Sequence, residues 1–253
     1  MLRIVNLDIS WGTKKVLSVP RLEIAKGDVV FIYAGNGTGK SSLLKFIAAQ
    51  DESGKLNSIG EINYPESFSY NTKLDIRRNT VVVPQNERFT SNETIYDFLT
   101  FRVKYGIVSL PDKQLNLEEY VDTYCNDNLI YNALHLKNIR DMKKCKIRQL
   151  SEGQKHILSI YGALFCNGDK HLYLFDEPLN HLDYDNGRNV LNTITRLHYN
   201  NSKSIILICS HCKSITIANR FFTIKDAKII EQDANRFINF GCFGMIDNKG
   251  FYI

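Results

Sequence analysis

Long apolar runs are absent from this sequence. The two longest, Val29–Ala34 and Ile205–Cys209, contain six and five residues, whereas a helix needs roughly 20 apolar residues to cross a bilayer. We therefore expect no membrane-spanning segment. The N-terminal stretch MLRIVNLDIS alternates like a strand and has no apolar run behind its charge, so we expect no signal peptide. Any membrane role would depend on another chain.

Regularly spaced cysteines are also missing. Only Cys209 and Cys212 have C-x-x-C spacing, and no second pair lies near them. Reduced cysteines in a cytosolic protein are therefore a better interpretation than a zinc or redox site. The five prolines and fifteen glycines form no low-complexity tract, and no repeat of 20–50 residues is present.

Charge of one sign is in only slight excess. The chain has 32 basic and 27 acidic side chains, so its net charge is +5. This balance favours anionic partners mildly and does not by itself indicate a nucleic-acid-binding protein. With 253 residues, 43% of them hydrophobic, the chain can bury a sizeable core in one large or two small domains.

Short apolar segments predict a parallel sheet. Residues 28–33 form a continuous apolar strand of the kind that is buried on both faces, and they lead through AGNGTGKSS into a helical pattern at 42–49. Three more β-branched or aromatic runs are separated by helical stretches, as parallel strands require. They lie at residues 80–83, 171–175 and 204–209.

Two other regions have different patterns. Residues 2–9 and 15–24 read as strands joined by the turn SWGTKK. Residues 92–149 read as helices with few strand signals, interrupted by Asn–Asp clusters and Pro111. We expect this helical segment to be an insertion between two parts of the sheet.

The glycine loop predicts a nucleotide site. Its glycines allow successive backbone N–H groups to point into one concavity beside a helix N-terminus, where phosphate binds. Lys40 would reach the β- and γ-phosphates of ATP and Ser41 would ligate Mg²⁺, while Ala34 stands where the pattern usually has its first glycine. The residues assigned to this loop are Gly35, Asn36, Gly37, Thr38, Gly39, Lys40, Ser41 and Ser42.

Two adjacent carboxylates, Asp176 and Glu177, follow the apolar strand HLYLF. A strand parallel to the one before the phosphate loop would place Asp176 near the metal. Glu177, one residue further on, would face the γ-phosphate and polarise the attacking water. Lys40 and Mg²⁺ would offset the charge of both acids.

Taken together, the motifs resemble those of the ATP-binding cassette (ABC) ATPases over nearly the whole length of the chain and in the same order. LYLFDEP resembles the Walker B motif, and NHLD is similar to the D-loop. VVVPQN resembles the Q-loop, LSEGQK the signature motif LSGGQ, and CSHC the H-switch, while the only tryptophan lies where the family has an aromatic residue that stacks on adenine.

This resemblance implies a fold and a domain plan. The fold is an α/β P-loop NTPase (RecA-like) parallel-sheet core with an N-terminal antiparallel β subdomain and an inserted α-helical subdomain. The single cassette would span residues 1–253, with 1–85 and 150–253 forming the nucleotide-binding core and 86–149 the helical subdomain.

The resemblance also implies individual roles. Trp11 would stack on the base, Gln85 would contact Mg²⁺ or water, and Glu177 would be the general base. His211 would contact the γ-phosphate. The active species would be a head-to-tail dimer of cassettes. Four residues would act on the other protomer, at its nucleotide or through the D-loop: Ser151, Gly153, Gln154 and Asp183. The expected catalytic residues are Glu177, His211, Gln85 and Lys40, and the expected metal ligands are Ser41, Gln85 and Asp176.

Glu152 is the departure that matters most, because the family usually has glycine at this position of the signature. A carboxylate near a triphosphate is unfavourable by sign. We expect Glu152 either to point to solvent or to pair with a nearby lysine, leaving the site active or somewhat weakened.

Two functions fit these motifs. The first is the ATPase subunit of a membrane transporter, with a second cassette (identical or paralogous) and separate permease subunits as partners, at the cytoplasmic face of a membrane. The second is a soluble cassette of the ABC-F type acting on the ribosome or another complex. EPLNHLD closely resembles the EPTNHLD motif of that group. Those proteins carry two cassettes and usually LSGGE, so we favour transport, and we expect no nucleic-acid partner unless the second function holds.

Overall fold

The computed structural model describes residues 1–50, 56–90, 92–105, 116–127, 130–165, 170–211 and 217–233. Cys212 of the C-x-x-C pair and Pro111 lie outside these residues. Cys209 is fully buried, and burial raises the pKa of its thiol well above the ordinary value. The described residues contain no cluster of histidine, cysteine and carboxylate side chains that could hold a metal.

The centre of the molecule is a parallel sheet. Strands β5, β6, β7 and β3 pair in that order, and β8 continues the sheet in parallel with β3. Every residue of β6 and β7 is buried, which explains their continuous apolar sequences. The bounds are β3 Val29–Tyr33, β5 Thr80–Val83, β6 Leu172–Asp176, β7 Ile205–Ser210 and β8 Arg220–Lys225.

The same sheet continues into antiparallel strands, giving the order β4-β1-β2-β9-β8-β3-β7-β6-β5. The predicted strands are confirmed, with no end shifted by more than two residues, but β4, β8 and β9 were not predicted. The antiparallel strands are β1 Leu2–Trp11, β2 Lys14–Ile24, β4 Leu56–Asn63 and β9 Lys228–Gln232.

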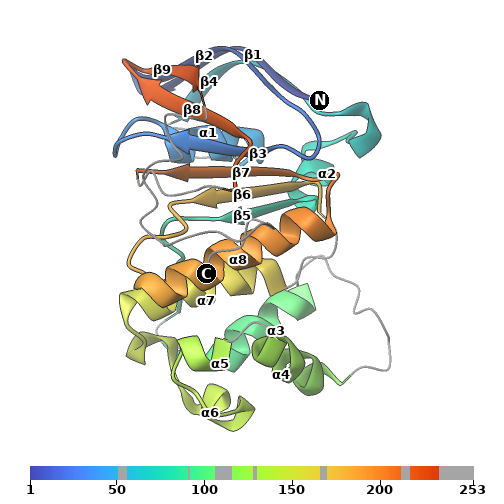
Figure 1. Cartoon of the computed structure of the whole chain (residues 1–253), viewed down its shortest axis with the longest axis vertical. Helices are drawn as coiled ribbons and strands as arrows, with labels where there is room; N and C mark the ends of the chain where they lie inside the picture. The colour runs from blue at the N-terminus through green and yellow to red at the C-terminus, as the bar shows by residue number, and fades with distance from the viewer. Residues whose placement is uncertain are drawn as a thin grey trace.

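The sheet is curled, and its two faces are covered by different helices. Figure 1 shows α1 enclosed between the antiparallel strands and the parallel core, with α7 and α8 on the opposite face. Two apolar clusters fill these two interfaces. The helices are α1 Lys40–Ile47, α2 Lys73–Arg78, α7 Glu152–Phe165 and α8 Tyr184–Asn200, and the short 3-10 helices are η1 Glu66–Phe68 and η2 Ile147–Gln149.

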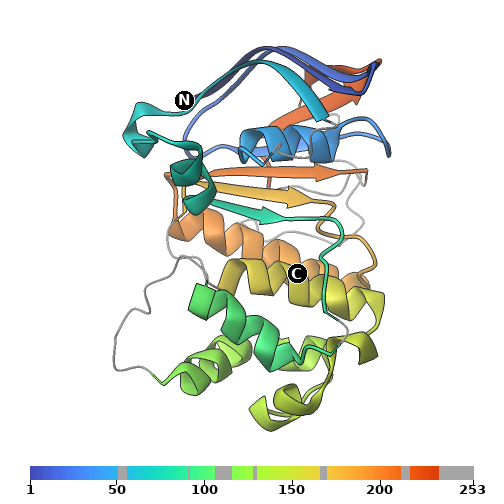
Figure 2. The ribbon, with the colours of Figure 1, turned by 180° about the vertical axis from the view of Figure 1, so that it is seen from behind.

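A group of helices lies beyond α7, at the far end from the antiparallel strands (Figure 2). These helices are α3 Ile95–Tyr105, α4 Leu117–Asp127, α5 Ile130–Ala133 and α6 Ile139–Lys144. An isolated antiparallel bridge between Thr94 and Lys146 brings the two ends of the segment together. On α7, Gly162 leaves room for α3, since a Cβ there would lie 2.4 Å from Cε1 of Phe98.

The strand register brings several loops to one edge of the sheet. Tyr33 pairs with Ser210, and Cys209 pairs with Asp176. Carboxyl ends of neighbouring parallel strands meet at the same edge, so the loops that follow β3, β5, β6 and β7 gather there. None of the helices in the described part of the chain has the length and apolar character that crossing a bilayer demands.

Candidate functional site

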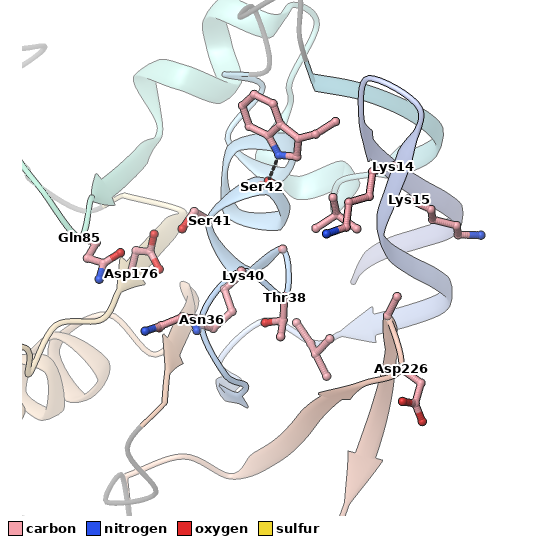
Figure 3. A pocket seen from close by; sticks show the side chains of 16 residues that line it. Lys14, Lys15, Asn36, Thr38, Lys40, Ser41, Ser42, Gln85, Asp176 and Asp226 are labelled. Carbon is pink, nitrogen blue, oxygen red and sulfur yellow. Dashed lines mark hydrogen bonds between the residues drawn. The ribbon is translucent and has the colours of Figure 1, made fainter.

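A cavity of about 820 Å³ lies at this edge of the sheet. Figure 3 shows the phosphate loop and the first turn of α1 in its centre, with Gln85 and Asp176 on one side and Lys14 on the other. The lining residues are Trp11, Lys14, Lys15, Val16, Asn36, Gly37, Thr38, Gly39, Lys40, Ser41, Ser42, Gln85, Asp176, Ile224, Asp226 and Ala227.

The glycines of the loop set its shape. Gly37 and Gly39 have φ angles of 75° and 96°, in the left-handed region that favours glycine. A Cβ on Gly39 would also lie 3.0 Å from Cβ of Leu17 and 3.1 Å from Cγ1 of Val16, so the loop packs closely against β2. Gly39 caps α1 without a side-chain hydrogen bond, which leaves the first amides of the helix for an anionic ligand.

Lys40 is buried at the base of the cavity, with 6% of its side chain exposed. Its ammonium group donates hydrogen bonds to the carbonyl oxygens of Ala34 (2.7 Å) and Gly35 (2.8 Å). Its Nζ also lies 3.0 Å from Oε1 of Glu177. Two carbonyl oxygens and one carboxylate oxygen therefore surround the ammonium group, and a phosphate group would have to replace at least one of them.

Glu177 is even more deeply buried, with 2% of its side chain exposed. Its Oε2 accepts hydrogen bonds from Oγ of Ser210 (2.9 Å) and the amide of His211 (3.1 Å), and Nδ1 of His211 lies 2.9 Å away. Burial alone would raise the pKa of Glu177, but the hydrogen bonds from Lys40, His211 and Ser210 outweigh it and lower that pKa. The carboxylate is thus kept ionised. Its φ of 53° is strained for a residue with a side chain.

Asp176 has the opposite electrostatics. Burial raises the pKa of its carboxyl group, a hydrogen bond with Ser41 opposes this shift, and the charge of Glu177 adds to it. Its Oδ1 is buried and has no hydrogen-bond partner among the described residues. A buried, unpaired carboxylate oxygen beside a serine hydroxyl fits a hard cation that prefers oxygen ligands, such as Mg²⁺.

The base-stacking candidate, Trp11, lies at the end of β1 with 42% of its surface exposed. Its indole Nε1 donates a hydrogen bond to Oγ of Ser42 (3.3 Å), which ties the ring to the start of α1. An exposed aromatic face at the cavity wall can stack on a base.

A second cavity, of about 580 Å³, lies at the start of α7 and α8. No residue lines both cavities. The second is lined by Ala133, His135, Ser151, Glu152, Gly153, Gln154, Ile157, His181, Leu182, Asp183 and Asn186.

Side-chain caps shape this second cavity. The amide of Ser151 donates to Oε1 of Gln154 (3.0 Å), and the amide of Gln154 donates to Oγ of Ser151 (3.2 Å). Asp183 caps α8 by accepting hydrogen bonds from the backbone and side-chain nitrogens of Asn186, both at 2.9 Å. A Cβ on Gly153 would lie only 2.5 Å from the carbonyl oxygen of His181, so the two loops need glycine to pack together.

Glu152 meets both conditions expected of it. Its side chain is 76% exposed, and its Oε1 lies 2.7 Å from Nζ of Lys155. The hydrogen bond from Lys155 is the main cause that lowers the pKa of Glu152.

The structure therefore sorts the predicted site residues into two groups. The phosphate loop, Trp11, Gln85 and Asp176 surround the first cavity, and Glu177 and His211 adjoin it through Lys40. Ser151, Gly153, Gln154 and Asp183 surround the second. Sequence reasoning missed Ser210, although it precedes His211 directly, and the turn residues Asp226 and Ala227, since the β8–β9 hairpin was not predicted.

The fold and the first cavity define a P-loop ATPase. The model of the family described as ABC transporter matches residues 17–180, about two thirds of the chain, and the chain belongs to this family. It is an ABC ATPase, which binds ATP and hydrolyses it to ADP and phosphate.

Individual relatives agree with this assignment. The energy-coupling factor transporter ATP-binding protein EcfA of Pediococcus pentosaceus is 27% identical over 225 residues, which cover 88% of this chain and 74% of EcfA. EcfA1 of Fusobacterium nucleatum is 26% identical over 234 residues, covering 90% and 80%. The dimeric bacterial ABC transporter cassette MJ0796 has a similar fold, with a TM-score of 0.71 at 21% identity over 92% of this chain and 99% of that one.

Proposed function

We propose that this chain is the ATP-hydrolysing subunit of a membrane transporter, in which two cassettes close around ATP and separate permease subunits carry the cargo. The observation that carries the proposal is that a single chain contains two cavities with no shared lining residue, one with the phosphate loop and one with the signature. A head-to-tail pair of cassettes would bring each phosphate loop opposite the signature of the other.

The chemistry is assigned to residues of the first cavity. ATP would draw Lys40 away from the loop carbonyls and from Glu177 toward its β- and γ-phosphates. Glu177, kept ionised by its hydrogen bonds, would then accept a proton from the water that attacks the γ-phosphorus, while ADP leaves. His211 would hold Glu177 through Oε2 and reach the γ-phosphate.

Asp176, Ser41 and Gln85 would hold Mg²⁺. The unpaired Oδ1 of Asp176 supports this assignment, and all three residues line the same cavity. When bound, the ion supplies positive charge that offsets the charge of the phosphates.

Transport is favoured over a soluble ABC-F-like role. The relatives EcfA and EcfA1 are named as transporter ATP-binding proteins. We propose that this chain associates peripherally with the cytoplasmic face of a membrane through its permease partners. In this proposal residues 86–149 form a helical subdomain, and its position would change with the nucleotide bound and be transmitted to the permease partners.

The dimer and the partner can be tested separately. A Glu177→Gln variant should remain monomeric without nucleotide and should form a dimer at saturating ATP and Mg²⁺, measured by light scattering after size exclusion. A tagged parental chain should co-purify with integral membrane subunits. A variant that stays monomeric would contradict the two-cassette site, and co-purification with ribosomes instead would support the soluble alternative.

A further inference from the structure

One ion pair lies at the start of α7, and one of its two residues, Glu152, lines the second cavity, called here the signature cavity. Glu152 and Lys155 lie three residues apart at the first turn of α7, and Nζ of Lys155 is 2.7 Å from Oε1 of Glu152. The backbone fixes their spacing, because the amide of Lys155 donates to the carbonyl oxygen of Ser151 (2.9 Å).

The pair has little to contribute to folding. The Glu152 side chain is 76% exposed, and ion pairs of this kind are screened by water and salt. The position of the pair matters more than its contribution to the stability of the fold, because Glu152 lines the cavity together with Ser151 and Gly153.

Glu152 is the carboxylate of this cavity that forms no helix-capping hydrogen bond among the described residues, although it lies in the first turn of α7. The other one, Asp183, accepts two hydrogen bonds from Asn186 as the cap of α8. If a triphosphate enters the cavity, an uncompensated Glu152 would repel it, and only the cation of Lys155 is bonded to that carboxylate among the described residues.

We propose that Lys155 is a positioning residue that neutralises Glu152 and thereby allows the signature half-site to accept the triphosphate bound to the other cassette. This inference rests on the two-cassette function proposed above. It assigns to a lysine that touches no catalytic group a role in setting the ATP concentration at which the cassettes close.

The test is a double-mutant cycle in the Glu177→Gln background, where closure is read as dimer formation rather than turnover. Lys155→Met should raise the ATP concentration for half-maximal dimerisation by about three- to tenfold, the size expected for one uncompensated charge near a partly solvated ligand. Glu152→Gln together with Lys155→Met should restore the parental value within about twofold.

The salt dependence of dimerisation distinguishes an electrostatic role of Lys155 from a merely structural one, because only an electrostatic defect should change with ionic strength. Raising the ionic strength from low salt to about 0.5 M shortens the screening length to a few ångströms, so the defect of Lys155→Met should shrink. Lys143→Met is the matched control, since Lys143 also forms an ion pair, with Glu118, but this acidic partner lines neither cavity, whereas Glu152 lines the signature cavity. It should dimerise like the background protein.

Three results would overturn the proposal. They are a Lys155→Met protein with an unchanged ATP requirement, a double variant as impaired as Lys155→Met alone, and an equal defect in Lys143→Met. A background Glu177→Gln protein that stays monomeric at saturating ATP would instead overturn the two-cassette function, and this inference with it. Unchanged thermal unfolding midpoints in all variants would show that the fold is intact.

Discussion

The cavity with the phosphate loop (the nucleotide cavity) and the signature cavity are built in different ways. In the nucleotide cavity, charged groups are buried and hold one another, with Lys40 and Glu177 only 6% and 2% exposed. At the signature cavity the carboxylate of the Glu152–Lys155 pair is 76% exposed, and Ser151 and Asp183 cap the helices that follow them. The first cavity thus holds buried charges whose partners a phosphate would have to displace, whereas the second is a more exposed surface that helix caps hold in place.

This difference has an energetic meaning. Burying ionised groups costs several kcal/mol each unless they are paired and hydrogen-bonded, so a buried Lys–Glu pair is retained where its chemistry is needed. Capping hydrogen bonds at helix ends contribute about 1 kcal/mol each and fix the loops without demanding burial. Variants in the nucleotide cavity should therefore affect ATP binding and hydrolysis directly, whereas variants in the signature cavity should affect the closure of the two cassettes.

The largest effect is expected for Glu177→Gln. The amide cannot accept the proton of the attacking water, so the rate of ATP hydrolysis should fall about 10²- to 10⁴-fold. ATP binding should persist, because the loop amides and Lys40 are unchanged, and phosphate release measures the rate. Glu118→Gln, at an acid outside both cavities, is the control. Parental turnover in Glu177→Gln would remove this residue from the role of base.

Lys40→Met should damage both binding and folding. The variant lacks the cation for the β- and γ-phosphates, and it leaves the buried Glu177 carboxylate without its cationic partner. We expect the free energy of unfolding to fall by about 3 kcal/mol, measured by urea titration, and ATP binding to be lost. Adding Glu177→Gln should restore stability but not binding. Failure to restore stability would mean that the ion pair is not what the fold depends on.

The nucleotide cavity was the more predictable of the two. Its residues follow short apolar strands, so the position of each loop could be inferred from the parallel sheet. The sequence also led us to expect that Lys40 offsets the charge of Glu177, but it did not show how the two meet, because their contact depends on β7 lying between β3 and β6. That strand order leaves no local signal in the sequence.

The remaining misses also have tertiary causes. Strand β4 is an edge strand with many exposed residues, and β8 and β9 are short segments that pair through a two-residue turn at Asp226 and Ala227, both with positive φ. For Gly153, the resemblance implied only a role toward the nucleotide of the other protomer. The structure adds that its missing Cβ makes room for the carbonyl oxygen of His181.

Gly153→Ala should therefore disturb the signature cavity alone. The new methyl group would meet a backbone oxygen at 2.5 Å, and relief by backbone movement costs about 1–3 kcal/mol. ATP-dependent dimerisation and hydrolysis should both fall, whereas ATP binding to the isolated chain, followed by Trp11 fluorescence, should remain. Loss of ATP binding would show that the two cavities are not independent.

A smaller effect is expected at the wall of the nucleotide cavity. Trp11→Ala should weaken ATP binding by about 1–2 kcal/mol, the usual contribution of stacking between an aromatic side chain and a base. Trp11→Phe should recover most of the affinity. Equilibrium binding of a fluorescent ATP analogue would measure both. Equal affinity in all three proteins would argue against stacking at this residue.

The smallest effect concerns two histidines outside the chemistry of either cavity. His156, on α7, is 5% exposed and its Nε2 donates to the carbonyl oxygen of Glu177 at 3.1 Å, while His171 stacks on Phe68 with ring centroids 4.2 Å apart. Burial is the main cause that lowers the pKa of both imidazoles. As pH falls through about 6.5, the unfolded chain binds protons before the folded one, so the free energy of unfolding should decrease.

The slope of the free energy of unfolding against pH is at most about 1.4 kcal/mol per pH unit for each histidine. Urea unfolding between pH 7.5 and pH 5.5 would measure it, and His156→Gln, which keeps a donor for Glu177 but does not titrate, should show a shallower slope. An identical slope in this variant would mean that folding does not lower the pKa of His156.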